Sequence, residues 1–151
     1  MPKKKRVLAI ASAGGHWQQL MLLRPAYDVH DVHFATTLEG LDASYGAHPC
    51  HVVPDCNRNE RIAMVRSAAA VFSLVLKLRP DIVVTTGALP GVMALVAARL
   101  VRARTVWIDS VANAEEMSMS GRLARRFADL WLSQWESVAE CEGAGYEGSV
   151  L

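Results

Sequence analysis

The chain has 151 residues, of which 52% are hydrophobic and 21% charged, so it fits one folded domain and is not a disordered chain. A net charge of +1 gives no general attraction to nucleic acid, and we expect no nucleic-acid partner. Basic side chains dominate between Arg58 and Arg104, whereas the segment from Ala128 onward carries acidic but no basic side chains. This segregation predicts two differently charged surfaces.

The N-terminus and the cysteines indicate an intracellular protein. The basic run at residues 3–6 precedes only five apolar residues, too few for a secretory signal. Cys50, Cys56 and Cys141 have no metal-site or disulfide spacing, which is typical of reduced thiols. We expect neither a metal nor a cofactor.

The first predicted unit is a strand at 7–11, a glycine turn and a helix at 17–23. The turn contains Ser12, Gly14, Gly15 and His16. Adjacent glycines let a backbone approach a ligand closely, and the N–H groups that open the helix favour an anion. This motif alone is equally compatible with a purely structural turn.

Apolar and β-branched runs predict further strands at 32–36, 51–53, 82–86, 105–108 and 130–133, and a last strand that starts near Gly148. Helices are expected at 60–78, 92–100 and 122–127, with Asn59 as the N-cap of the first.

The predicted helix at 60–78 has a wider apolar surface than a one-sided core helix needs, and its charges after Glu60 are all basic. Its uncharged stretch, 67–76, is too short to span a bilayer. Three interpretations remain open: a core helix, a partner-binding helix, or a helix that lies on an anionic membrane surface. The membrane interpretation assigns contacts to Ile62, Val65, Arg66, Phe72 and Leu76.

A second glycine turn follows the strand at 82–86 and contains Gly87, Pro90 and Gly91. Asp109 and Ser110 follow the next strand, and a polar loop continues to residue 121. The predicted architecture is α/β, a single Rossmann-like, doubly wound and mostly parallel sheet of about six strands. Right-handed crossovers bring the two glycine turns and Asp109 and Ser110 to one crevice.

Five motifs in order resemble one protein group. They are Ser-Ala-Gly-Gly-His, Thr-Thr-Gly-Ala-Leu-Pro-Gly, Trp-Ile-Asp-Ser, Ser-Met-Ser-Gly-Arg and Ser-Gln-Trp. The group comprises the membrane-anchor subunit of the eukaryotic two-part UDP-GlcNAc transferase of dolichol-linked oligosaccharide synthesis, and bacterial exopolysaccharide proteins of PssD type.

The resemblance implies the N-terminal, acceptor-side half of a GT-B glycosyltransferase such as MurG, with residues 1–151 as one domain. It implies transfer of a sugar from a UDP-sugar to a polyprenyl-diphosphate-linked saccharide, together with a partner subunit that binds the donor. The chain departs from the eukaryotic anchor because no transmembrane segment precedes its first strand. We therefore expect peripheral attachment, through the helix at 60–78, to the cytoplasmic face of the inner membrane.

The resemblance also implies roles for single residues. Gly14 and Gly15 approach the acceptor diphosphate, and the acceptor site further includes Ser12, Gly87, Pro90, Gly91 and Ser110. His16 is a general base, a phosphate ligand or a capping ring without chemistry, and the alternative bases are Asp109, Glu115 and Glu116. Trp131, Gln134 and Trp135 face the partner or are plain packing residues.

Two further functions remain open at this stage. One is a non-catalytic scaffold that recruits the donor-binding subunit to the membrane. The other is a nucleotide-binding α/β domain unrelated to glycans.

Overall fold

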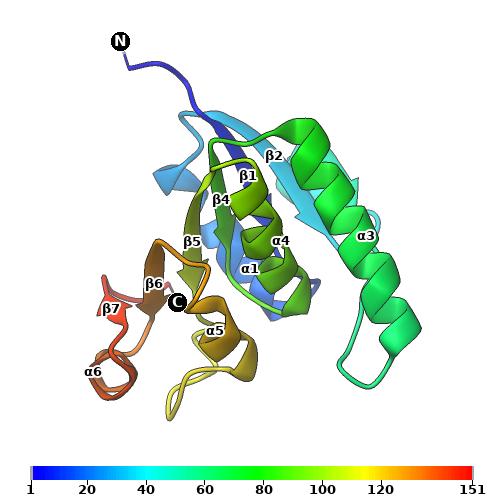
Figure 1. Ribbon diagram of the computed structural model, residues 1–151. Coiled ribbons are helices and arrows are strands. Elements are labelled where there is room, and N and C mark those ends of the chain that lie inside the picture. Colours follow the sequence, from blue (N-terminus) through cyan, green and yellow to red (C-terminus); the bar gives the residue numbers. More distant parts are fainter. Residues whose placement is uncertain (1, 151) are drawn as a thin grey trace.

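Seven parallel strands form a single sheet in the computed structural model, which describes residues 2–150 (Figure 1). Their order across the sheet is β3-β2-β1-β4-β5-β6-β7. The strands are β1 (Arg6–Ile10), β2 (Asp31–Thr36), β3 (Cys50–Val52), β4 (Ile82–Thr85), β5 (Arg104–Ile108), β6 (Leu130–Ser133) and β7 (Gly145–Tyr146).

Helices lie on both faces of the sheet. They are α1 (Gly15–Leu22), a short 3-10 turn η1 (Arg24–Ala26), α2 (Leu41–Tyr45), α3 (Arg61–Leu78), α4 (Leu89–Leu100), α5 (Met119–Ala124) and α6 (Glu136–Glu142). In Figure 1, α3, α4 and α5 lie in front of the sheet and α1 lies behind it. Each face has its own core, one around Val71, Val75 and Leu95, the other around Trp17, Leu20 and Phe34. The predicted Rossmann-like, doubly wound fold is confirmed.

The strand order reverses between β1 and β4. From β1 the chain moves outward to β2 and β3, and from β4 it moves outward in the opposite direction to β7. Both central strands are rich in buried apolar residues, as strands covered on both faces must be. Open α/β sheets bind ligands at such a switch point, beyond the carboxyl ends of the strands.

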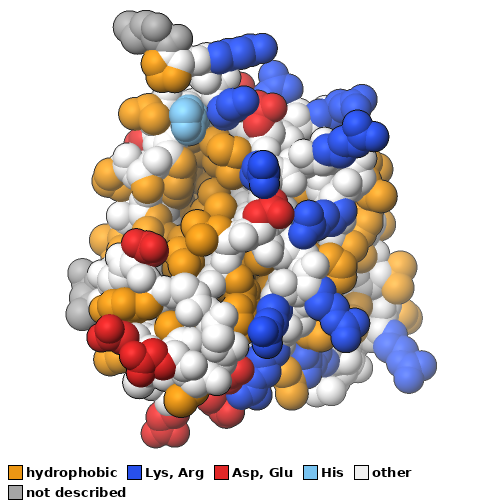
Figure 2. Space-filling model, turned by 60° about the vertical axis from the view of Figure 1, so that its left-hand side comes forward, with side chains coloured by type: hydrophobic (Ala, Val, Ile, Leu, Met, Phe, Trp, Pro, Cys, Tyr) orange, Lys and Arg blue, Asp and Glu red, His pale blue; other side chains and the backbone are white. Residues whose placement is uncertain are grey.

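The sheet face that carries α1 is only partly covered over β4, β5 and β6. Ile82, Val106 and Ile108 are partly buried there, and Leu130 is exposed. These residues line a largely apolar cavity of about 290 Å³. Figure 2 shows apolar side chains exposed between acidic side chains at its lower left and Lys and Arg side chains along its right. The expected separation of acidic and basic surfaces is visible in this view.

Several predicted boundaries were wrong. The last strand is β7, which ends before Gly148, and the sheet has seven strands where about six were expected. Neither α2 nor α6 was predicted, and α5 begins at Met119 because the Ser118 hydroxyl accepts from the Gly121 N–H as its N-cap. Asn59 does not cap α3, which has no side-chain cap.

Candidate functional site

The two predicted glycine turns lie side by side at the switch point. Nδ1 of the His16 ring lies 3.1 Å from the Thr86 carbonyl oxygen, and the Thr86 hydroxyl donates to the His16 carbonyl at 2.6 Å. Gly87 makes this approach possible, because a Cβ there would lie 2.6 Å from Nδ1 of His16. The start of α1 and the turn before α4 are therefore in direct contact and form one continuous surface.

The contact with Thr86 determines the tautomer of His16. A carbonyl oxygen only accepts hydrogen bonds, so Nδ1 must carry the proton. In the neutral ring Nε2 then carries the lone pair, and it makes no hydrogen bond within residues 2–150. A half-buried imidazole with a fixed Nδ1–H and a free Nε2 has the form of a general base.

Two helix N-termini open onto this crevice without a capping side chain. Gly14 precedes α1 with φ +84°, and Ala88 precedes α4 with φ +62°. Gly15 is exposed and has open space around its Cβ position. The first N–H groups of a helix lack intrahelical partners and favour an anion, which applies to α1. At α4, Pro90 has no N–H and the Gly91 N–H donates to the Ala88 carbonyl.

The remaining residues predicted for the acceptor site shape the crevice from beneath. Ser12, Pro90 and Gly91 are buried. A Cβ on Gly91 would lie 2.2 Å from the Thr85 hydroxyl oxygen, so only glycine lets α4 start this close to β4. Pro90 lies in the first turn of α4, as predicted.

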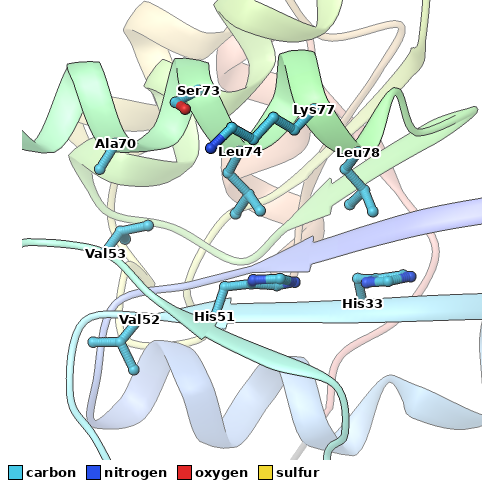
Figure 3. Close-up of a pocket in the computed structure, with 9 residues that line it drawn as sticks. All are labelled: His33, His51, Val52, Val53, Ala70, Ser73, Leu74, Lys77 and Leu78. Atoms are coloured by element: carbon cyan, nitrogen blue, oxygen red, sulfur yellow. The ribbon is translucent and has the colours of Figure 1, made fainter.

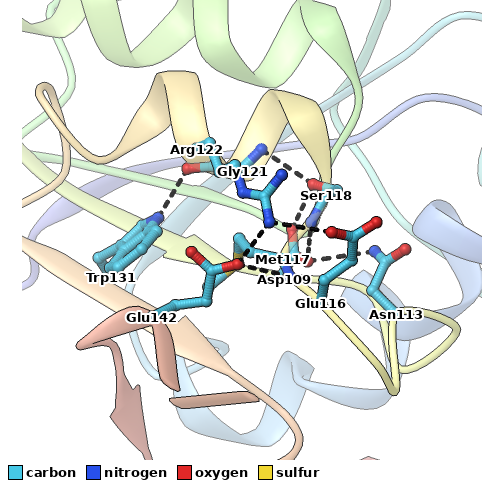
Figure 4. Close-up of polar contacts among 9 residues, drawn as sticks. All are labelled: Asp109, Asn113, Glu116, Met117, Ser118, Gly121, Arg122, Trp131 and Glu142. Carbon is cyan, nitrogen blue, oxygen red and sulfur yellow. Dashed lines mark hydrogen bonds and ion pairs between the residues drawn. The ribbon is translucent and has the colours of Figure 1, made fainter. Parts of the chain in front are cut away.

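Asp109 holds the following loop in place and does not face the crevice as a free base. Asp109 is only 2% exposed. Its carboxylate accepts from the Trp107 indole. It also accepts from the Asn113 side-chain amide and from both the N–H and the hydroxyl of Ser118 (Figure 4). Where a catalytic base was expected, the structure shows a carboxylate that accepts four hydrogen bonds within the protein.

Glu115 and Glu116 are exposed on the same loop. Glu116 pairs with Arg122 at 3.0 Å, and Arg122 also pairs with Glu142 of α6 at 2.7 Å (Figure 4). The hydrogen bond from Arg122 holds the pKa of Glu142 below its usual range. These contacts tie the loop to α5 and α6.

A buried amide pair, which the sequence analysis missed in part, joins α1 to the loop. Gln134, expected at a partner surface, is only 3% exposed. Its amide donates to Gln19 at 2.7 Å and to the Asp109 carbonyl at 2.9 Å. Gln19 in turn donates to the Ser110 hydroxyl and accepts from the Val111 N–H. Gln134 therefore cannot contact a partner, and Gln19, three residues after His16, belongs to the site.

The two tryptophans predicted for partner contact also have internal hydrogen bonds. The indole of Trp135 donates to the Val111 carbonyl at 2.7 Å, and this side chain remains exposed. The indole of Trp131 donates to the Gly121 carbonyl, and the Arg125 guanidinium lies over its ring. Both rings brace the loop, whatever else they contact.

The α3 residues predicted for membrane contact are mostly exposed. Ile62, Val65 and Leu76 are 79%, 69% and 48% exposed, and Arg66 is exposed beside them. Phe72 differs, because it is half-buried and packs against the core. No helix within residues 2–150 combines the length and the hydropathy needed to cross a bilayer.

A separate cavity of about 500 Å³ lies at the other edge of the sheet, between α3 and the strands β2 and β3 (Figure 3). His33 and His51 form its floor as a stacked pair, with ring centroids 5.8 Å apart. Burial and the neighbouring His33 lower the pKa of His51. This pair is distant in topology from the switch point and was not predicted.

A family model described as "Oligosaccharide biosynthesis protein Alg14 like" matches residues 50–150, which is more than half of the chain. The UDP-N-acetylglucosamine transferase subunit ALG14 of Eremothecium gossypii is 38% identical over 88 residues, covering 50% of this chain and 39% of that protein. Its namesake in Mus musculus is 31% identical over 75 residues, covering 46% and 35%. The chain thus spans well under half the length of these relatives.

Solved structures share the fold at low sequence identity. MurG of Acinetobacter baumannii superposes with a TM-score of 0.65 at 14% identity, over 86% of this chain and 41% of that one. UDP-N-acetylglucosamine 2-epimerase of Rickettsia bellii superposes with a TM-score of 0.71 at 15% identity, over 97% and 45%. The family match and the Rossmann-like sheet agree, and the chain belongs to the Alg14-like family of oligosaccharide biosynthesis proteins.

Proposed function

We propose that this protein is a membrane-associated subunit of a split GT-B glycosyltransferase in polysaccharide biosynthesis. It presents a polyprenyl-diphosphate-linked saccharide as acceptor, while a partner subunit binds the UDP-sugar. The observation that carries the proposal is the switch point, where the uncapped N-terminus of α1 contacts the turn before α4 through His16 and Thr86. The names of the relatives, each a subunit of a UDP-N-acetylglucosamine transferase, support the reaction class.

The crevice offers complementary groups for the two parts of such an acceptor. The N–H groups that open α1 meet the diphosphate, because this helix end favours negative charge. Nε2 of His16 takes the proton from the acceptor hydroxyl as its oxygen bonds to the anomeric carbon of the donor sugar. The bond from that carbon to the diphosphate breaks, and UDP leaves with the electron pair.

The exposed face of α3 would lie on the membrane and would be extended by α5. Met119 and Leu123 of α5 are exposed apolar side chains, and the Arg58 guanidinium contacts the Met119 sulfur. These residues and Arg126 line one cavity of about 550 Å³. Exposed apolar side chains flanked by arginines suit an anionic bilayer, here the cytoplasmic face of the inner membrane.

The partly open sheet face over β4, β5 and β6 supports a role for a partner. Apolar lining such as Val106, Ile108 and Leu132 around a 290 Å³ cavity is typical of surfaces that another protein covers. Trp135 is exposed at the end of β6 and would border that contact.

The decisive experiment compares His16→Asn with the natural chain. The protein is combined with a candidate donor-binding subunit, and transfer from radiolabelled UDP-GlcNAc to a short-chain polyprenyl-diphosphate saccharide is measured. Asparagine retains an amide donor for the Thr86 carbonyl but has no base at the position of Nε2. We expect an intact fold by circular dichroism and a fall in kcat of about a hundredfold or more.

The results also separate the alternatives. Undiminished turnover with His16→Asn would favour the non-catalytic scaffold, a role for which the exposed face of α3 would be sufficient as the membrane contact. Full transfer activity by this chain without a partner would contradict the split enzyme. Tight binding of UDP-GlcNAc and none of the lipid acceptor would favour a nucleotide-binding domain.

A further inference from the structure

The loop that follows β5 depends on α1 for its position. Residues 110–118 have no regular structure apart from turns and bends, and they follow β5 at the carboxyl end of the sheet, as the turn that carries His16 follows β1. From α1, Gln19 reaches into this loop, with its amide nitrogen 3.1 Å from the Ser110 hydroxyl and its carbonyl oxygen 3.0 Å from the Val111 nitrogen. Gln19 is itself buried.

Gln134 completes the connection from the end of β6. Its two amide hydrogens go to Gln19 and to the Asp109 carbonyl, and its oxygen accepts from the Val150 N–H at 2.8 Å. The pair thus links α1, the ends of β5 and β6, and the C-terminal segment. A buried amide that loses its partner is costly, so these elements hold one another in a fixed register.

The other hydrogen bonds of the loop lie within it or join it to Asp109, to the Trp135 indole, to α5 and to Glu142 of α6. The Ala112 N–H donates to Ser110, and the Asn113 N–H donates to the Ser110 carbonyl. The Trp135 indole donates to the Val111 carbonyl. Within residues 2–150, the Gln19 side chain makes the only hydrogen bonds between the start of this loop and the helix that carries His16.

We propose that Gln19 is a positioning residue, which holds loop 110–118 against α1 so that the loop and His16 meet the acceptor as one rigid wall. The link to the acceptor rests on the proposed function, whereas the positioning of the loop does not. Gln134 acts through the same contact, because its amide holds the Gln19 oxygen that also receives the Val111 N–H.

The first experiment uses nuclear magnetic resonance of the full chain and needs no ligand. Gln19→Met keeps the length of the side chain and removes every hydrogen bond it makes. We expect the indole N–H signal of Trp135 to shift and the amides of Asn113 and Ser118, which do not touch Gln19, to exchange at least tenfold faster. Gln19→Glu retains the oxygen that accepts from Val111 and Gln134 and should restore most of this protection.

Tyr27→Phe is the matched control. The Tyr27 hydroxyl donates to the Leu20 carbonyl at 2.6 Å, so this variant removes one buried hydrogen bond at the same helix without touching the loop. It should leave the Trp135, Asn113 and Ser118 signals unchanged. Changes confined to Val111, or equal changes in both variants, would overturn the positioning role.

The second experiment measures the affinity of each variant for a short-chain polyprenyl-diphosphate N-acetylglucosamine by titration. Gln19→Met should weaken binding at least tenfold and Tyr27→Phe less than twofold. Gln134→Met should match Gln19→Met, and the double variant should be no worse than either. If Gln19→Met releases the loop but leaves the affinity unaltered, the loop does not take part in acceptor binding. If the natural chain does not bind the acceptor, the proposed function is refuted, while the first experiment remains valid.

Discussion

Gly87→Ala is the substitution by which the geometry of the crevice is best tested. Gly87 has φ +136°, where an L side chain is strained, and its Cβ would lie 2.6 Å from Nδ1 and 2.8 Å from Cε1 of His16. Strain of this kind costs about 1–3 kcal/mol, and forcing the ring aside costs about 1–3 kcal/mol. Loss of the bond from His16 to Thr86 adds about 1 kcal/mol.

The expected loss is therefore about 5 kcal/mol of unfolding free energy, measured by urea denaturation, or roughly 15 °C in Tm for a chain of this length. Gly15→Ala is the control, because its Cβ position is open and its φ lies outside the left-handed region. That variant should be unchanged or more stable by about 0.5 kcal/mol.

A double-mutant cycle separates the steric part of this loss. His16→Ala removes the ring that a Cβ on Gly87 would meet, so in that background Gly87→Ala should cost only the backbone strain. We expect a coupling energy of about 3 kcal/mol, from the displaced ring and the lost hydrogen bond together. Additive effects, or a Gly87→Ala variant as stable as the natural chain, would refute the close packing of the two turns.

Two further predictions concern surfaces outside the crevice. Replacing both Ile62 and Val65 by aspartate should weaken binding to anionic liposomes, measured by flotation, about thirtyfold, because about 2 kcal/mol of apolar burial is lost. The control Val29→Asp changes a residue that is similarly exposed, at 67%, and should bind as the natural chain does. An equal loss of binding in both variants would argue against a specific membrane face. Burial and the neighbouring His33 lower the pKa of His51 in the folded protein. As the pH falls, the unfolded chain therefore binds a proton at this residue before the folded chain does, and stability should decrease below the ordinary histidine pKa. His51→Phe should reduce the difference in stability between pH 7 and pH 5, measured by urea denaturation.

The fold was largely predictable, because apolar runs identify buried strands without knowledge of their neighbours. The strands from β1 to β6 were each predicted within two residues of their observed bounds. The exception is β7, whose two residues, Gly145 and Tyr146, carry no apolar run. α2 was missed for a similar reason, since one turn with polar residues such as Asp42 and Ser44 has too few positions to show a helical period.

The candidate site was predictable in its backbone and less so in its side chains. Glycines at 14, 15, 87 and 91 and Pro90 act through the main chain, whose course follows from strand order and crossover handedness. Asp109 was expected to face a ligand, yet four donors surround it. Nothing in the local pattern reveals that Ser118 and Asn113 fold back onto it.

By itself, the sequence determined which segments become strands, that two glycine turns follow β1 and β4, and that α3 carries apolar and basic residues on more than one side. These are local properties of period, conformational freedom and charge. Tertiary structure alone decided which polar groups pair: the contact of His16 with Thr86 that frees Nε2, the burial of Gln134, and its bond to Gln19. A hydrogen bond between residues 115 positions apart depends on where two elements meet in space, and no pattern within either element contains that information.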